Sequence, residues 1–332
     1  MKRNLYLVSL ILIMYIFNSG CGDKKAAVNP SELLTQAKTF FAPLPAKMPG
    51  AENDSPELIA LGKKLYFETH LSFNNSQSCN SCHNIENGAA GVDNKQFSIG
   101  ADGGKGGRNS PTVLNAGFQF VQFWDGRAKD LFEQAKGPIL NPKEMGLKSD
   151  KDAEKAISGF SEYKNMFLKA FPADNGAITF DNIAMAIAAF ERTLISKSRF
   201  DNFLSGNVTT LNEAELAGLK AFMAAGCNAC HQGAMIGGNM YQKMGLLKPY
   251  QNTKDLGRFE VTKLESDKFI FKVPTLRNID RTSPYFHDGS VASLYDAVKM
   301  MGSLELGKEL LPEDILSIVI FLKALNDKDA TK

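Results

Sequence analysis

Apolar residues recur every three or four positions in four segments of the chain, at 55–67, 179–196, 210–226 and 311–325. This spacing predicts amphipathic helices, and Ser55 at the start of the first segment is typical of a helix cap. The segments form two successive pairs, and each pair opens and closes one unit of the chain. The pattern therefore predicts a mainly helical protein with two units that divide near residue 200.

A Cys-x-x-Cys-His pattern lies inside each unit, as CNSCH at 79–83 and as CNACH at 227–231. This pattern attaches c-type haem, because its two thiols add to the haem vinyl groups and its histidine is positioned as an iron ligand. The residues concerned are Cys79, Cys82, His83, Cys227, Cys230 and His231. One copy could be chance or a redox or zinc pair, but two copies use every cysteine except Cys21 and leave none for a disulfide.

A helix, the haem motif, a long loop and a closing helix follow one another in both units, which is the plan of a small class I cytochrome c. We therefore predict a mainly α fold with two class I cytochrome c-like domains, each with one covalently bound c-type haem. We place these domains at 51–200 and 201–332. The surplus length of the first domain runs over 97–178, and long loops in compact domains are often functional.

The N-terminus combines two basic residues with an apolar run over 5–17 and small residues before Cys21. This arrangement is typical of a secretory signal over 1–20, and its end resembles a bacterial lipobox, in which the cysteine is lipidated. The alternatives are an ordinary signal peptide and an uncleaved anchor, although about 13 apolar residues are short for a spanning helix. We expect a tether and extended lead over 21–50, and a periplasmic protein held to a membrane by a lipid on Cys21.

Composition excludes one class of partner. The 332 residues are 44% hydrophobic and 22% charged, which suits globular domains and not a disordered chain. The formal charge of +2 falls to zero without Lys2 and Arg3 (2 − 2 = 0), and the sequence has no long basic run. We therefore expect no nucleic-acid partner.

Histidine is scarce, because the chain has four and two of them belong to the haem motifs. A methionine thioether is a plausible further ligand of the second haem, and it raises the potential relative to a second histidine. Five methionines follow the second motif: Met235, Met240, Met244, Met300 and Met301. A class I cytochrome carries its methionine just before the closing helix, so Met300 and Met301 fit and the others lie too close to the motif. Core packing is the alternative role.

The long segment of the first unit carries chemistry that suits an open haem face. Trp124, the only tryptophan, is followed by Glu133, Gln134 and Glu144. Peroxide activation needs a base that takes a proton from one oxygen and returns it to the leaving oxygen, and a glutamate above a haem can do this. A neighbouring amide can hold peroxide by a hydrogen bond. Away from a haem, the tryptophan would belong to the core and the carboxylates would be solvated.

Several blocks of this sequence resemble the bacterial di-haem cytochrome c peroxidases. The blocks are the two haem motifs, GGRNSPTVLNA (106–116), FWDGRAKDLFEQAKGPILNPKEMG (123–146), DLGRF (255–259) and FKVPTLRNIDRTSPYFHDGSV (271–291). They occur in order and at matching intervals between residues 50 and 327. The resemblance implies a low-potential peroxidatic haem in the first domain and a high-potential haem in the second, where electrons arrive.

For the first haem, the resemblance implies that His83 is the proximal ligand and that Glu144 is the distal acid–base group. It also implies that Gln134 is the distal amide and that Phe123 lines the pocket. Trp124 would lie between the haems, in position to assist electron transfer.

For the second haem, the resemblance implies that His231 and Met301 are the iron ligands, with the spacing to the preceding block selecting Met301 over Met300. It implies that His287 interacts with a haem propionate. It also implies hydrogen peroxide as substrate, a small cytochrome c or cupredoxin as electron donor, and a homodimer.

A calcium ion between the domains is a further implication of the resemblance. Its ligands would be the side chain of Asn109 and the backbone carbonyls of Thr282 and Pro284. Carbonyl and amide oxygens suit the preference of calcium for hard oxygen ligands.

One position departs from the family pattern. In many members a histidine follows the Ser-Ile-Gly stretch, caps the peroxidatic iron in the oxidised enzyme and moves away once the other haem is reduced. That position here is Ala101, within a glycine-rich loop, and a methyl group cannot bind iron. For His70, the other uncommitted histidine, we expect a surface or structural role. We therefore expect an enzyme that is active without reductive displacement of a ligand.

Two other functions compete with peroxide reduction. The related di-haem oxidases that modify tryptophan residues of a partner protein use tyrosine on the second haem, and Met301 argues against that function. A plain electron carrier would have two saturated haems, and Ala101 together with Glu144 argues against that function.

Overall fold

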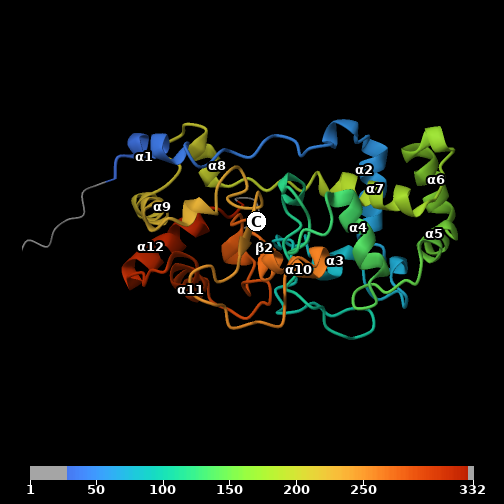
Figure 1. The fold of residues 1–332 in the computed structure, drawn as a ribbon. Helices are drawn as coiled ribbons and strands as arrows, with labels where there is room; N and C mark the ends of the chain where they lie inside the picture. The colour runs from blue at the N-terminus through green and yellow to red at the C-terminus, as the bar shows by residue number, and fades with distance from the viewer. Residues whose placement is uncertain (1–27, 328–332) are drawn as a thin grey trace, which may run out of the picture.

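Two helical units lie at opposite ends of the computed structural model, with a layer of loops between them (Figure 1). The structure describes residues 28–327, so the predicted signal peptide and Cys21 lie outside the described residues. The helices of the first unit are α2 (Pro56–Tyr66), α3 (Cys79–Cys82), α4 (Leu131–Leu140), α5 (Asp150–Ser158), α6 (Ser161–Ala170) and α7 (Phe180–Glu191). The second unit contains α8 (Arg199–Leu204), α9 (Glu213–Ala225), α10 (Phe259–Thr262), α11 (Leu294–Leu306) and α12 (Pro312–Lys323), with an antiparallel ribbon of β1 (Tyr241–Lys243) and β2 (Ile270–Lys272).

The mainly helical fold is confirmed, and side-chain caps fix where its helices begin. Ser55 Oγ accepts the N–H of Leu58 at 3.1 Å at the start of α2. Thr179 caps α7 in the same way, also at 3.1 Å. Helix α9 begins later than the apolar pattern predicts, because Asn212 and Glu215 form a reciprocal capping box. Each cap satisfies backbone N–H groups that have no partner within the helix.

The opening and closing helices of each unit cross in direct backbone contact. Helix α2 meets α7 at Gly62, where a Cβ atom would lie 1.8 Å from the carbonyl oxygen of Ala186. Helix α9 meets α12 at Gly218, where a Cβ atom would lie 2.0 Å from the carbonyl oxygen of Ser317. Only glycine permits such an approach. The two units therefore share the same close crossing of their opening and closing helices.

Each unit also buries its own apolar core. Leu61 of α2 and Ile183 of α7 belong to the core of the first unit. Leu219 of α9, Phe321 of α12 and Phe200 of α8 belong to the core of the second. Because Phe200 packs with the second core, α8 is structurally part of the second unit.

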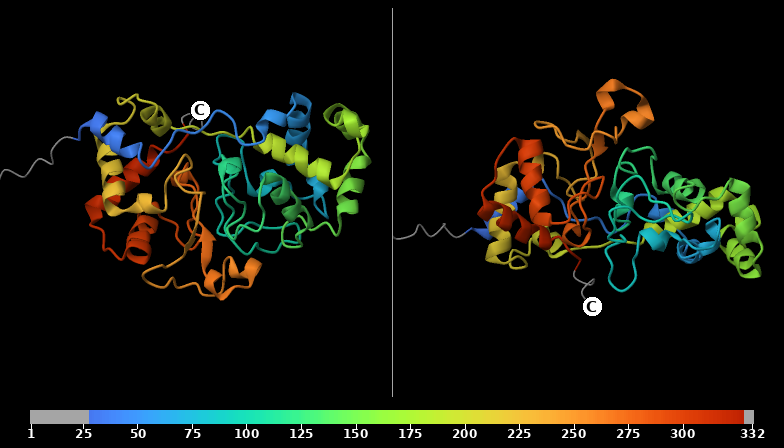
Figure 2. Two further views of the ribbon diagram at one scale, coloured as in Figure 1. Left: turned by 45° about the horizontal axis from the view of Figure 1, so that its top comes forward. Right: turned by 90° about the horizontal axis from the view of Figure 1, so that it is seen from below.

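The loops between the helices repeat as well, and they face one another in the middle of the molecule (Figure 2). Phe123 and Phe286 both adopt positive φ, at 65° and 71°, within the segments Phe-Trp-Asp-Gly and Phe-His-Asp-Gly. An antiparallel bridge closes each of these turns. The position of Trp124 in the first unit is therefore the position of His287 in the second.

The segment before residue 51 is not extended throughout, which corrects the prediction for 21–50. Helix α1 (Pro30–Ala37) packs on the core of the second unit through Leu33, Leu34 and Ala37. Proline predicted an extended chain here, but Pro30 occupies the first turn of the helix, where its missing N–H costs nothing.

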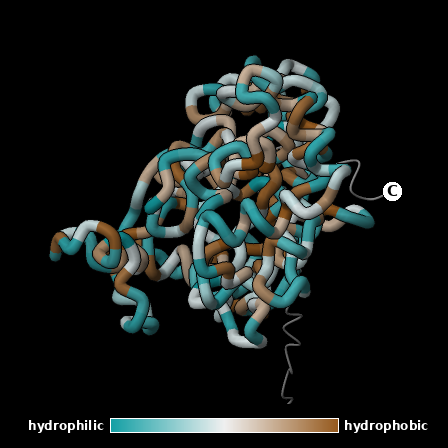
Figure 3. The backbone as a smooth tube through the Cα atoms, turned by 90° about the vertical axis from the view of Figure 1, so that its right-hand side faces the viewer, coloured by the Kyte–Doolittle hydropathy of each residue, from teal (hydrophilic) through white to brown (hydrophobic). Residues whose placement is uncertain are grey.

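No helix within residues 28–327 is both long and apolar enough to cross a membrane. Hydrophilic and hydrophobic residues are interspersed along the chain (Figure 3). The predicted lipid attachment at Cys21 concerns residues outside this range.

Adding a methyl group at either helix crossing is expected to destabilise the protein. Gly62→Ala and Gly218→Ala each place a Cβ atom against a backbone carbonyl, so the helices must separate at a cost of about 1–3 kcal/mol or more. Gly159→Ala is the control, because that glycine has a φ of −65° and no heavy atom within 4 Å of an added Cβ. Thermal unfolding of the haem-loaded protein measures the effect, and equal stability of all three variants would contradict the role of the crossings.

Candidate haem sites

A cavity of about 840 Å³ adjoins the first haem motif. Its wall brings Cys79, Cys82 and His83 together with side chains from far downstream in the chain. The four residues predicted for the surroundings of the first haem all line it: Phe123, Trp124, Gln134 and Glu144. Glu133, in contrast, has a side chain that is 39% exposed and lies near Lys136, outside this wall.

The ring of His83 is held by a backbone carbonyl. Its Nδ1 lies 2.9 Å from the carbonyl oxygen of Pro111, which fixes this nitrogen as the donor and leaves Nε2 with a free lone pair. The Tyr66 hydroxyl donates to the carbonyl of His83 itself at 2.5 Å. Desolvation by the surrounding protein lowers the pKa of His83, so the ring is neutral and suited to bind a metal.

Glu144 is positioned by the turn that follows α4. Asn141 Nδ2 donates to Glu144 Oε1 at 2.8 Å. Burial raises the pKa of Glu144 above its ordinary value, while the charge of Arg127 and the Asn141 hydrogen bond act in the opposite direction. A carboxyl group with a raised pKa can both accept and return a proton near neutral pH.

Ala101 is buried and held by two hydrogen bonds. Its N–H donates to the carbonyl oxygen of Glu144 at 2.7 Å, and Asn74 Nδ2 donates to its carbonyl oxygen at 2.7 Å. Gly100 packs so closely on this turn that a Cβ atom would lie 2.2 Å from the carbonyl oxygen of Lys143. Gly100 is part of the cavity wall and Ala101 is not.

A second cavity, of about 220 Å³, adjoins the second haem motif. The residues predicted for the second haem line it together: Cys227, Cys230, His231, His287 and Met301. Met300 points elsewhere and packs against the core of the second unit. Position on α11 therefore favours Met301 over Met300 as the side chain that faces a haem.

Both histidines of the second cavity are neutral and well placed for a haem. His231 Nδ1 lies 3.3 Å from the carbonyl oxygen of Ile236, and burial lowers the pKa of His231 to about 4. His287 is 3% exposed and stacks on Phe271 with 4.1 Å between ring centroids. His287 Nε2 is buried without a hydrogen-bond partner within the described protein. Because buried polar atoms are normally hydrogen-bonded, this nitrogen is available to a bound ligand.

The two cavities share a wall, and Trp124 is part of it. The indole Nε1 of Trp124 donates to the carbonyl oxygen of Asn109 at 2.8 Å. The N–H of Asn109 donates in turn to the carbonyl oxygen of His287 at 2.8 Å. This partition therefore joins residues of the first unit directly to the second haem cavity.

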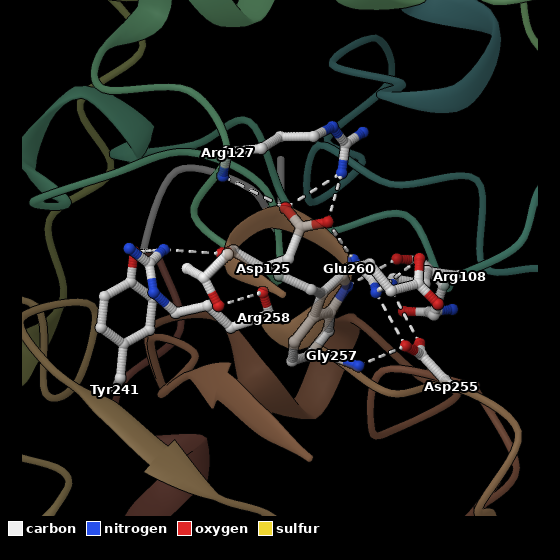
Figure 4. Close-up of polar contacts among 11 residues, drawn as sticks. Arg108, Asp125, Arg127, Tyr241, Asp255, Gly257, Arg258 and Glu260 are labelled. Atoms are coloured by element: carbon white, nitrogen blue, oxygen red, sulfur yellow. Dashed lines mark hydrogen bonds and ion pairs between the residues drawn. The ribbon is translucent and has the colours of Figure 1, made fainter. Parts of the chain in front are cut away.

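An ionic network also ties the units together, and sequence reasoning gave its members no role (Figure 4). Arg108 binds Asp125 at 2.6 Å and makes a two-point contact with Asp255 at 2.7 Å for each bond. Arg127 binds Asp125 from the other side at 3.0 Å. Asp255 lies in the second unit, so Arg108 spans the joint. The charged residues stand in the motif blocks, but their pairing depends on tertiary contacts.

Two buried charged residues were likewise missed. Glu191, on the apolar face of α7, lines the first cavity; burial raises its pKa to about 8, and its Oε2 has no partner within the described protein. Lys272 is 5% exposed and lines both cavities. The local sequence signals neither burial, because Glu191 is followed by Arg192 and Lys272 alternates with the apolar residues Phe271 and Val273.

The three residues predicted to bind calcium all line the second cavity, but no hydrogen bond joins them directly. Asn109 is 8% exposed, and its Nδ2 donates to the carbonyl oxygen of Lys95 at 2.9 Å. Thr282 and Pro284 line the second cavity. Within residues 28–327 no group of three or more His, Cys, Asp or Glu side chains is arranged for a metal. The calcium site stays a prediction.

His70 lies outside both cavity walls. Its Nδ1 is 2.6 Å from Glu68 Oε1, and Tyr163 donates to the other oxygen of Glu68 at 2.6 Å. The ring also packs against Phe160, with 4.7 Å between centroids. These contacts give His70 a structural environment away from the haem motifs.

The residues of the two cavities fit covalent haem. Each cavity has a pair of thiols, an oriented neutral imidazole and an apolar lining. The second cavity also contains the thioether of Met301, whereas the first contains the carboxyl group of Glu144 and the amide of Gln134. The unpartnered His287 Nε2 and the buried Lys272 supply donors for the propionate groups that every such haem carries.

Comparisons with known proteins point to one family. Residues 56–209 match the family model of di-haem cytochrome c peroxidase. The chain is 46% identical to the cytochrome c551 peroxidase of Pseudomonas aeruginosa, over 88% of this chain and 86% of that protein. It is 47% identical to the cytochrome c551 peroxidase of Nitrosomonas europaea, over 82% of this chain and 80% of that protein.

More distant relatives include the methylamine utilization protein MauG of Methylorubrum extorquens, which is 33% identical over 83% of this chain and 77% of that protein. The crystal structure of a MauG-like protein associated with microbial copper homeostasis superposes with a TM-score of 0.78 at 28% identity, covering 87% of this chain and 95% of that one. The predicted family is therefore confirmed: this chain belongs to the di-haem cytochrome c peroxidase family.

Proposed function

We propose that this protein is a cytochrome c peroxidase that reduces hydrogen peroxide to water in the first cavity, with electrons received at the second. The observation that carries the proposal is the convergence of Glu144 and Gln134 on the same cavity as His83 and its two neighbouring cysteines. The names of the relatives at 46% and 47% identity support the same reaction. The donor that we propose is a small cytochrome c or cupredoxin.

Covalent haem, when bound by Cys79, Cys82 and His83, supplies the iron and the redox equivalents for peroxide reduction. The Pro111 carbonyl keeps the ring of His83 in one orientation, so that Nε2 is directed to the metal-binding side. The second cavity would hold its haem through Cys227 and Cys230, and His231 and Met301 are the residues that would bind its iron.

Glu144 would move the proton of the bound peroxide. Its carboxylate would accept a proton from one peroxide oxygen and return it to the other, which leaves as water when the O–O bond breaks. Two electrons from the donor and two further protons would reduce the remaining oxygen to a second water. Asn141 fixes Oε1 by its hydrogen bond, so Oε2 is the oxygen available for this exchange. The amide of Gln134 orients peroxide from α4, and Phe123 closes the wall beside it.

Electrons would cross between the cavities at Trp124, because its indole lines both. Its Nε1 bond to Asn109 holds the ring at the shared wall. The further components of the proposal are a calcium ion at Asn109, Thr282 and Pro284, a homodimeric state, and a periplasmic location with a lipid on Cys21. Sequence resemblance alone supports these.

Met301 supports peroxide reduction over the chemistry of the tryptophan-modifying relatives, whose second haem uses tyrosine. The thioether of Met301 faces the second cavity. A plain electron carrier would need neither an acid–base group such as Glu144 nor a first cavity of about 840 Å³.

Removing the carboxyl group of Glu144 separates a peroxidase from an electron carrier. Glu144→Gln is expected to lower peroxide turnover by about 10²-fold or more, the usual contribution of a general acid–base group. Haem content and both midpoint potentials should stay near wild type. Glu133→Gln is the matched control, because that side chain lies outside the cavity wall. Unchanged turnover in Glu144→Gln would refute the assigned role.

The pH profile of turnover should reflect the raised pKa of Glu144. The carboxylate must be ionised to take a proton, so kcat/KM falls as pH drops through this pKa, above the value of about 4.3 for ordinary glutamate. Arg127→Gln removes the charge that lowers the pKa, and the acid limb should move to higher pH. Lys129→Gln, an exposed charge change in the same loop, should leave it in place. An unmoved limb in Arg127→Gln would contradict the assignment.

The fully oxidised protein should react with peroxide without prior reduction, because Ala101 offers no iron ligand. Electron paramagnetic resonance and stopped-flow mixing with peroxide test this on the as-isolated enzyme. His70→Ala should behave like the wild type in both. A low-spin bis-histidine signal from the first haem, with no reaction until reduction, would show the expectation to be wrong.

A further inference from the structure

Lys272 occupies an unusual place for a lysine. It ends strand β2 with apolar neighbours, Phe271 and Val273, and only 5% of its surface is exposed. Its side chain lines the first and the second cavity alike. Its backbone N–H donates to the carbonyl oxygen of Trp124 at 2.7 Å. Lys272 is therefore fixed at the partition, next to the residue that both cavities share.

The ammonium group of Lys272 has no counter-charge of its own. Its hydrogen bond goes to the carbonyl oxygen of Val121, at 3.1 Å. No carboxylate oxygen of the described residues lies within 4.0 Å of Lys272 Nζ, the limit for an ion pair. Asp125 acts on Lys272 through its charge, but its carboxylate is already bound by Arg108 at 2.6 Å and by Arg127 at 3.0 Å.

Burying the Lys272 ammonium without an opposite charge costs free energy, and no carboxylate of the described residues pairs with it to offset that cost. Burial accordingly lowers the pKa of Lys272 to about 7. An anion beside the ammonium would favour the charged form and raise this pKa again. The ammonium has three donors, and a single carbonyl oxygen uses one of them. The geometry thus describes a site that expects an anion from a cavity.

Carboxylates are the anions that the cavities would contain. A haem held in either cavity carries propionate groups, and His287 Nε2 is a second unpartnered group on the side of the second cavity. Lys272 lines both cavities, so its ammonium group can form a hydrogen bond with one propionate carboxylate from each haem.

We propose that Lys272 is a shared anion site, which binds a propionate carboxylate of each haem and raises the midpoint potential of both. The proposal rests on the two haem sites of the proposed function, but not on peroxide turnover. A positive charge near a haem stabilises the reduced state, which carries one positive charge less. Because the same charge acts on both haems, its removal should shift both in the same direction.

Redox titration of the haem-loaded protein tests this proposal. Lys272→Gln and Lys272→Met remove the charge, and both midpoint potentials are expected to fall. Lys272→Arg keeps the charge, and both should stay near wild type. Lys268→Gln is the control: that lysine lies nearby in sequence, is 37% exposed and pairs with Glu265 at 2.7 Å. A fall in one potential only, or in neither, would overturn the shared site.

A crystal structure of the haem-loaded wild type gives an answer that does not depend on the folding of variants. Lys272 Nζ should lie within hydrogen-bond distance of a propionate oxygen of each haem. If this contact is missing for either haem, the proposal is refuted. Both measurements are independent of peroxide turnover. A protein that fails to reduce peroxide can still show the fall in both midpoint potentials. An active peroxidase whose potentials do not fall in the Lys272 variants would refute the shared anion site and leave the proposed function intact.

Discussion

The hydrogen bonds of the partition are the constraint on which the arrangement of the two sites depends. Asn109 accepts from the indole of Trp124 and donates to the carbonyl of His287, so one peptide segment fixes an aromatic ring and the opposite unit together. Arg108, the preceding residue, adds charge pairs to both units. Residues of this joint form part of the wall that the two cavities share, which the proposed electron transfer would cross.

The two units are versions of one structure that have diverged in their side chains. Gly62 and Gly218 make the same helix crossing, and the aromatic turns repeat in backbone conformation. Differences concentrate at the cavity walls. Glu191 lines the first cavity from the end of α7, whereas Leu322 lines the second near the end of α12. The first cavity is the larger and includes Glu144, Gln134 and Glu191 in its wall, whereas Met301 and Leu322 line the smaller second cavity.

The sequence was sufficient for those features that depend on local pattern. Helices with apolar spacing and the two haem motifs were predictable, because these signals lie within a few residues of one another. The presence of Glu144 and Gln134 in the same cavity as His83 was predicted by resemblance and not by spacing. Helix α1 was missed because Pro30 predicts an extended chain unless it is known to begin a helix.

Tertiary pairing escaped prediction for a different reason. Arg108 finds Asp255 from 147 positions away, and nothing in either segment specifies the other. Lys272 follows an apolar residue in a short strand, where alternation predicts a side chain in solvent. Its burial depends on the close approach of the first unit, which the local sequence does not encode.

The hydrogen bond between Ala101 and Glu144 connects the glycine-rich loop to the proposed acid–base residue. The N–H of Ala101 holds the carbonyl of the acid–base residue itself, and Asn74 anchors the loop from behind. In family members that carry a histidine at this position, the resemblance implies a loop that moves when the other haem is reduced. The proposed enzyme has alanine there and no ligand to withdraw, so we expect the loop to hold Glu144 in the same position in every oxidation state.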